Sequence, residues 1–155
     1  HNGSRGLGDV YKRQPMFPDG MIHRSSQERM RYAQVLVYIA AADGALVREE
    51  IAMIEAMMGK AMMHPESRIT VRAGFEQPIP IEQSIADIDP EFAQVMLRDA
   101  ALVAAVDGAY DRKELAALRK IAKVGKVSPD QLSDLLDWVA EGWNWFEKGT
   151  EILVK

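Results

Sequence analysis

Two stretches of this chain have nearly the same pattern, YIAAADG at residues 38–44 and LVAAVDG at residues 102–108. In both, an apolar segment runs directly into Asp-Gly, and a glutamate follows the glycine after five intervening residues, at Glu50 and at Glu114. An apolar run that ends at a glycine is typical of a buried helix and its C-terminal turn. The sequence therefore predicts two helix–turn–helix units built on one plan.

Capping signals indicate where helices begin. Ser25 and Glu28 form a capping-box pattern before the almost wholly apolar segment 30–42, and Asp111 and Glu114 form another before a helix that Gly125 closes. Apolar spacing and Pro-containing caps predict further helices over 51–62, 81–88, 90–106 and from 129 onward. Residues 64–80 lose this period and contain three prolines, so they are expected to be a connection.

The fold class follows from these segments. No stretch alternates convincingly with a period of two, which argues against a sheet. Aligning Asp43 with Asp107 also aligns the two glycines, the two glutamates and several apolar positions. We therefore expect an all-α bundle of six to seven helices, built from two pseudo-symmetric helix–turn–helix units.

Each Asp-Gly turn has the spacing of the second half of a calcium-binding EF-hand loop: an oxygen ligand, a turn glycine and a glutamate. The first half of that loop is apolar in both repeats, so neither turn alone supplies the six to eight oxygens that Ca²⁺ prefers. A metal site would therefore have to be shared between both turns, which pseudo-symmetry would bring to one end of the bundle. The candidate ligands are Asp43, Glu50, Asp107, Asp111 and Glu114.

The same residues have a reading that needs no metal. Aspartate at a helix end can accept hydrogen bonds from the amides of a turn, and glycine can form a C-cap. Glu50 and Glu114 can fold back onto the N-caps of their own helices as capping-box residues. Both readings remain open from the sequence.

The two turns resemble the A-x-D-G-x-[apolar]-x-x-x-E pattern of the TerB-like domain. This pattern is present at Ala41 to Glu50 and at Ala105 to Glu114, and the resemblance extends over about residues 27–145. TerB-like domains occur in tellurite-resistance proteins and in the membrane-anchored co-chaperone DjlA. The chain departs from the pattern at Val47, where a polar residue would match Asp111, and no J-domain signature follows.

The resemblance implies an all-helical, duplicated fold with an acidic divalent-metal site and no known catalysis. It also implies a role in stress-response protein assemblies, some of them associated with a membrane. On this basis we expect a non-enzymatic module in the cytoplasm that binds a divalent cation, Ca²⁺ first among them. It would contact other proteins, including a stress-response complex at the inner face of the membrane. The alternative is a metal-free helical scaffold or adaptor.

Composition limits the chemistry available to the chain. The 155 residues include no cysteine, which excludes thiolate ligands and a cysteine nucleophile. They include only three histidines, which argues against a histidine-rich zinc site. No apolar run approaches the length of a membrane span. Residues 1–15 are polar and resemble a translated adaptor remnant, so we expect a disordered or non-native tail, with the helical domain over 16–155.

Two other patterns are weaker. Residues 121–132 resemble a DNA-binding helix-turn-helix, but the following helix carries Asp130, Asp134, Asp137 and Glu141, which phosphates would repel, so no nucleic-acid partner is expected. Five methionines between residues 53 and 63 could bind copper(I), although packing between helices is their more common use.

Aromatic residues gather in the last helix. Trp138, Trp143, Trp145 and Phe146 lie within nine residues, and an apolar Ile-Leu-Val follows near the end of the chain. We expect most of this segment to lie against the core as a lid. Any part that stays exposed is a candidate surface for a protein partner, because aromatic side chains are favoured at interfaces.

Overall fold

The computed structural model describes residues 21–106 and 108–154, and all regular secondary structure in these residues is helical. This confirms the all-α class and the expected number of helices. The tail over residues 1–15 and Asp107 lie outside the described residues. The seven helices of the described residues are α2 (Ser26–Ala40), α3 (Arg48–Lys60), α4 (Pro65–Ala73), α5 (Ile81–Ser84), α6 (Pro90–Ala104), α7 (Arg112–Val124) and α8 (Pro129–Leu153).

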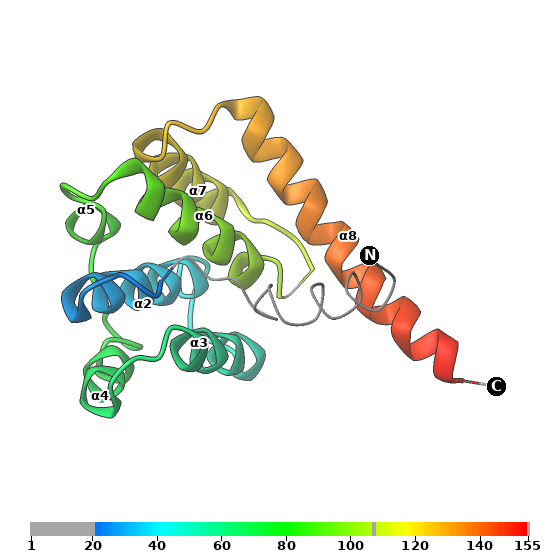
Figure 1. Ribbon diagram of the computed structural model, residues 1–155, viewed down its shortest axis with the longest axis horizontal. Helices are drawn as coiled ribbons and strands as arrows, with labels where there is room; N and C mark the ends of the chain where they lie inside the picture. Colours follow the sequence, from blue (N-terminus) through cyan, green and yellow to red (C-terminus); the bar gives the residue numbers. More distant parts are fainter. Residues whose placement is uncertain (1–20, 107, 155) are drawn as a thin grey trace, which may run out of the picture.

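Helix α2 forms the centre of the bundle. It contacts α3 and α4 on one side and α5, α6 and α7 on the other, as Figure 1 shows. Its aromatic and aliphatic residues Tyr32, Leu36 and Ile39 are fully buried, because helices cover it from nearly every direction. The nearly continuous apolar sequence of this segment therefore reflects burial on all sides.

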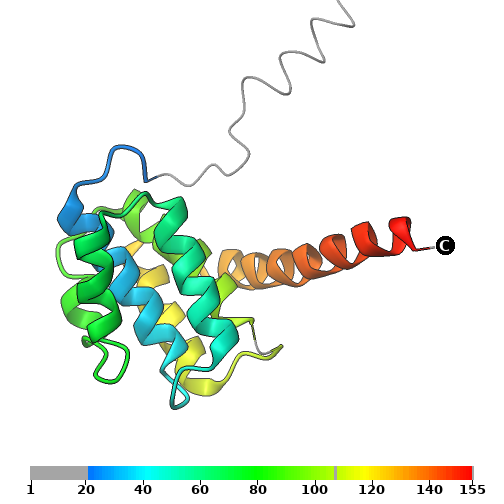
Figure 2. The same ribbon diagram turned by 90° about the horizontal axis from the view of Figure 1, so that it is seen from below.

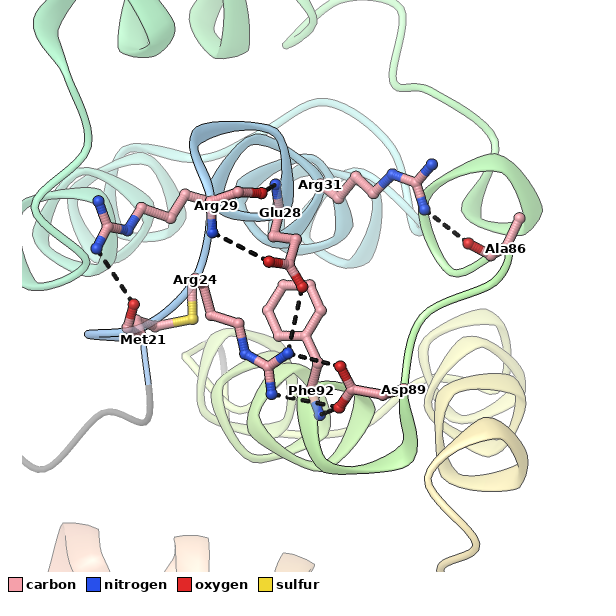
Figure 3. A network of polar contacts seen from close by, with 9 residues as sticks. Met21, Arg24, Glu28, Arg29, Arg31, Ala86, Asp89 and Phe92 are labelled. Atoms are coloured by element: carbon pink, nitrogen blue, oxygen red, sulfur yellow. Dashed lines mark hydrogen bonds and ion pairs between the residues drawn. The ribbon is translucent and has the colours of Figure 1, made fainter.

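The start of α2 is fixed to the start of α6 by a polar network (Figure 3). The Ser25 and Glu28 capping box is present, as expected from the sequence. The Arg24 guanidinium donates to both Asp89 oxygens at 2.6 and 3.2 Å, to Glu28 at 3.2 Å, and lies 4.6 Å from the centre of the Phe92 ring. Hydrogen bonds from Arg24 lower the pKa of Asp89, and the Phe92 backbone amide lowers it further.

Helix α7 packs against α6 at a close approach near its C-terminus. A Cβ placed on Gly125 would lie 3.3 Å from Gln94 Cγ and 3.5 Å from Ala93 Cβ, both on α6. Gly125 has an ordinary helical φ of −77°, and the left-handed residue that ends α7 is Lys126 at φ 56°. Gly125 is thus needed for close packing rather than for a left-handed turn.

The expectation that residues 64–80 are only a connection is wrong, because α4 occupies Pro65–Ala73. His64 caps this helix by accepting a hydrogen bond from the Glu66 amide at 3.2 Å, and proline occupies its first turn. Only Val71 is buried, so the helix has almost no apolar stripe for a sequence pattern to detect. Arg72 instead ties it to α3 through two hydrogen bonds of 2.7 Å to Glu55.

Helix α8 projects from the bundle instead of covering it (Figures 1 and 2). Its N-terminal part packs on α6 and α7 through Leu132 and Val139, which are 6% and 2% exposed. The lid expectation is wrong beyond Val139, since Trp145 and Phe146 are 70% and 66% exposed. None of the described helices combines the length and hydrophobicity that crossing a lipid bilayer requires.

Candidate metal centre

The Asp-Gly turns link the helices as the sequence pattern predicts. The first lies between α2 and α3, and the second lies between α6 and α7. Gly44 and Gly108 both have positive φ, +139° and +92°, a conformation that side-chain-bearing residues rarely adopt. A glycine at each turn is therefore a requirement of the backbone.

Three carboxylates from the two turns converge at one end of the bundle. Asp43 comes from the first turn, and Asp111 and Glu114 begin α7 after the second turn. One oxygen from each residue lies within 4.8 Å of the others, and such a group could hold a metal ion. Asp43 is exposed, Asp111 is half-buried and Glu114 is fully buried, so the group runs from the surface inward.

The first turn of α7 positions two of these carboxylates. The Glu114 amide donates to Asp111 Oδ1 at 2.7 Å, and the Asp111 amide donates to Glu114 Oε1 at 3.0 Å. This reciprocal capping box confirms the sequence expectation for the start of α7. It holds both side chains without metal, so capping accounts for part of their placement.

Glu50 behaves differently from Glu114, although the two occupy matching positions in the sequence. Its Oε1 accepts a hydrogen bond from the Val47 amide at 2.9 Å, and the residue is 3% exposed. The Val47 side chain has no oxygen that could accept a hydrogen bond from the Glu50 amide, so of the two capping-box hydrogen bonds only the one to the Glu50 carboxylate forms at the start of α3. Glu50 is outside the group of three carboxylates, and Asp107, the fifth predicted ligand, lies outside the described residues.

Three carboxylates concentrate negative charge at this end of the bundle. Within the described part of the chain Asp43 makes no hydrogen bond or ion pair. Burial raises the pKa of the neighbouring Tyr110 to about 12, and the negative charge of Glu114 adds to this shift. The Tyr110 hydroxyl donates to the Ala101 carbonyl at 3.1 Å and so fixes the second turn to α6. A cation at the three carboxylates would relieve their mutual repulsion.

Sequence reasoning missed a second acidic position, Asp99 in α6. This residue is fully buried and accepts hydrogen bonds from the Tyr32 hydroxyl at 2.5 Å and from the Arg98 guanidinium at 2.8 and 3.1 Å. The Lys60 ammonium lies 3.5 Å away, so α2, α3 and α6 meet at one carboxylate. The signal was present in the sequence as a charged pair within the long apolar run 92–106.

Other sequence candidates occupy ordinary structural positions. Met57, Met58 and Met63 are buried in the core, and Met62 is 57% exposed, so the five methionines do not present one shared face.

An open hollow of about 530 Å³ adjoins the first turn and is lined partly by Phe75 and Pro78. Of the basic residues of α7, Lys120 pairs with Glu82 at 2.7 Å.

Comparisons with known proteins add no functional assignment. No family model, no curated protein and no solved structure matches the chain. The functional argument therefore depends on the sequence pattern and on the geometry of the site.

Proposed function

We propose that this chain is a non-enzymatic helical module that binds a divalent cation, Ca²⁺ in the first place, between its two Asp-Gly turns. The observation that supports this most directly is the approach of Asp43, from one turn, to Asp111 and Glu114, from the other, within 4.8 Å. Asp43 is far from Asp111 and Glu114 in the sequence, so only the fold brings it to them. The resulting site is shared between the two units.

The donor set favours a hard cation. All three side chains offer carboxylate oxygens, and the group contains no histidine. Such donors suit Ca²⁺ and Mg²⁺, whereas structural zinc sites use cysteine and histidine. Three carboxylates are too few to saturate Ca²⁺, so water or backbone carbonyls would complete the shell and the affinity would be modest. Asp107, the aspartate of the second Asp-Gly turn, is a fourth candidate ligand.

The TerB-like resemblance supports the same proposal. Both units carry a positive-φ glycine, and in both a glutamate accepts a hydrogen bond from the amide at the start of the following helix. These shared features agree with two pseudo-symmetric units. We accordingly propose that the chain acts as a TerB-like module of stress-response, tellurite-resistance-like assemblies, in the cytoplasm or, through partners, at the inner face of the membrane.

Titration calorimetry and thermal unfolding with Ca²⁺, Mg²⁺ and Zn²⁺ test this function. The variants are Asp43→Asn and Asp111→Asn. Asparagine is as good an N-cap as aspartate, so the second variant removes charge and keeps the capping box. Asp137→Asn, on the exposed surface of α8, is the matched control.

We expect Ca²⁺ to bind the wild type and the control, and to bind each ligand variant more weakly by on the order of tenfold, because one of three carboxylates is lost. Absence of binding heat and of any thermal shift at millimolar ion would remove the metal function. Equal binding by Asp111→Asn and wild type would exclude Asp111 as a ligand.

A second candidate function is a metal-free interaction scaffold, which the exposed aromatic residues of α8 favour. Trp138, Trp143, Trp145 and Phe146 are 47%, 40%, 70% and 66% exposed. A helix that leaves such side chains in solvent is typical of a surface that another protein covers. Partner capture that depends on these residues and is indifferent to EDTA would favour this function over the first.

A further inference from the structure

The C-terminal part of α8 has no partner within the described residues. The helix packs on the bundle through Val139, and the segment after it extends away from the other helices in both views (Figures 1 and 2). Along this segment Trp145, Phe146, Ile152 and Leu153 are 70%, 66%, 74% and 83% exposed. The apolar surface is thus continuous with the face that is already buried at Val139.

The apolar residues of α8 repeat every seven positions. They come in adjacent pairs at Trp138-Val139, Trp145-Phe146 and Ile152-Leu153. An isolated α-helix has 3.6 residues per turn, so a strict seven-residue repeat drifts around its surface unless the helix supercoils about another. A sustained repeat of this kind is therefore the pattern of a helix that pairs with a helix.

Two glycines share the same repeat. Gly142 and Gly149 lie three residues before Trp145 and Ile152, on the same side of the helix. A Cβ added to either would meet nothing within 4 Å, so neither glycine is explained by packing inside this chain. Glycine also weakens a helix interior by about 1 kcal/mol relative to alanine. Small residues at a helix surface leave space that a large side chain of a second helix can fill.

One antiparallel register of two α8 helices fills this space. When Trp145 of one copy lies over Gly142 of a second copy, Trp138 of the first lies over Gly149 of the second. The same register brings Ile152 of one copy onto Leu135 of the other. Because antiparallel pairing is symmetric, every match occurs twice.

Charges beside this face favour the same arrangement. Asp134, Glu141 and Lys148 follow the seven-residue spacing immediately before Leu135, Gly142 and Gly149. In parallel pairing, these charged positions of one copy would lie beside Val139, Phe146 and Leu153 of the other, which offer no opposite charge. In the antiparallel register Glu141 of each copy lies within one turn of Lys148 of the other, which forms two attractive pairs.

The area available is sufficient for a specific contact. The exposed fractions of Trp138, Trp145 and Phe146 are 47%, 70% and 66%. Since an aromatic side chain buries roughly 150–250 Å², these residues in two copies would remove roughly 550–900 Å² from water. Ile152 and Leu153 add to this sum, which brings it near the roughly 1,000 Å² that a specific interface needs.

We propose that two copies of this chain form a dimer through antiparallel pairing of α8, with the tryptophans of one copy seated on the glycines of the other. This inference rests on the scaffold function proposed above and does not involve the cation. The two bundles would then lie at opposite ends of the paired helices.

Sedimentation velocity of the full chain tests the dimer and its register together. The variants are Glu141→Lys, Lys148→Glu and the double variant with both changes. Glu147→Lys, on the other side of α8, is the matched control for the first. Each single change turns two attractive pairs into repulsive ones and should weaken the dimer roughly five- to thirtyfold. The double variant, and an equimolar mixture of the two single variants, should recover wild-type association.

Several outcomes would overturn the proposal. One is a wild-type chain that stays monomeric at concentrations on the order of 100 µM, because self-association would then be too weak for a specific dimer. Another is a dimer that Trp145→Ala does not weaken. A dimer that the double variant fails to restore would exclude the antiparallel register. Repeating the measurement in EDTA separates the dimer from the cation site, since the dimer should persist without any cation.

Discussion

Replacing Asp43 by asparagine is expected to change the stability of the ion-free and the ion-loaded protein in opposite directions. Its carboxylate lies within 4.8 Å of oxygens of Asp111 and Glu114. Two unit charges at this separation repel by about 1 kcal/mol in water and by about 3 to 4 kcal/mol at an effective dielectric constant of 20. Asp43 is exposed, so the lower figure applies, and removal of its two repulsions should stabilise the ion-free protein by about 1–2 kcal/mol at low salt.

Calcium should reverse this order. A ligand at roughly 100 times its dissociation constant stabilises the folded protein by about 2.7 kcal/mol, provided that it does not bind the unfolded chain. The wild type, with three carboxylates, gains this stabilisation, whereas the variant retains two of them and gains much less. The variant should therefore be the more stable protein in EDTA and the less stable one in excess Ca²⁺.

Urea unfolding followed by circular dichroism, in EDTA and in excess Ca²⁺, measures both free energies, with Asp137→Asn as the control. Two results would refute the reasoning. If Asp43→Asn is less stable than wild type in EDTA, Asp43 stabilises its turn and does not suffer repulsion there. If Ca²⁺ stabilises both proteins equally, Asp43 is not part of the site.

Three further predictions concern the fold. Asp99→Ala should lower the free energy of unfolding by about 3–5 kcal/mol, since it leaves a buried network without its acceptor; chemical denaturation measures this loss. Gly125→Val should cost about 1–3 kcal/mol by the same assay, because its side chain would overlap α6. The pKa of Asp89 is lowered in the folded protein, so its pairing with Arg24 stabilises the fold above the unfolded pKa, and this contribution disappears as the pH falls through the folded value. Arg24→Met should accordingly reduce stability at neutral pH by at most about 1 kcal/mol, as the pair is partly exposed, and should flatten the acid limb of a stability–pH profile.

Local signals accounted for much of the helical framework. The capping boxes predicted at Ser25 and Asp111 both form, because they require only residues within one turn of each other. The sequence did not predict α4, because this helix buries little besides Val71 and is held through Arg72 to Glu55 of α3. α8 was found in the sequence, but its exposure was not, since an apolar stripe does not reveal what covers it.

The sequence by itself determined that the chain is helical, that two Asp-Gly turns follow apolar helices, and that acids surround those turns. Only the tertiary structure decided which acids meet: Asp43 joins Asp111 and Glu114, whereas Glu50 is engaged at the start of its own helix. The physical reason is distance along the chain. Capping depends on neighbours three residues apart, but the approach of the two turns depends on how α2 and α6 pack against each other.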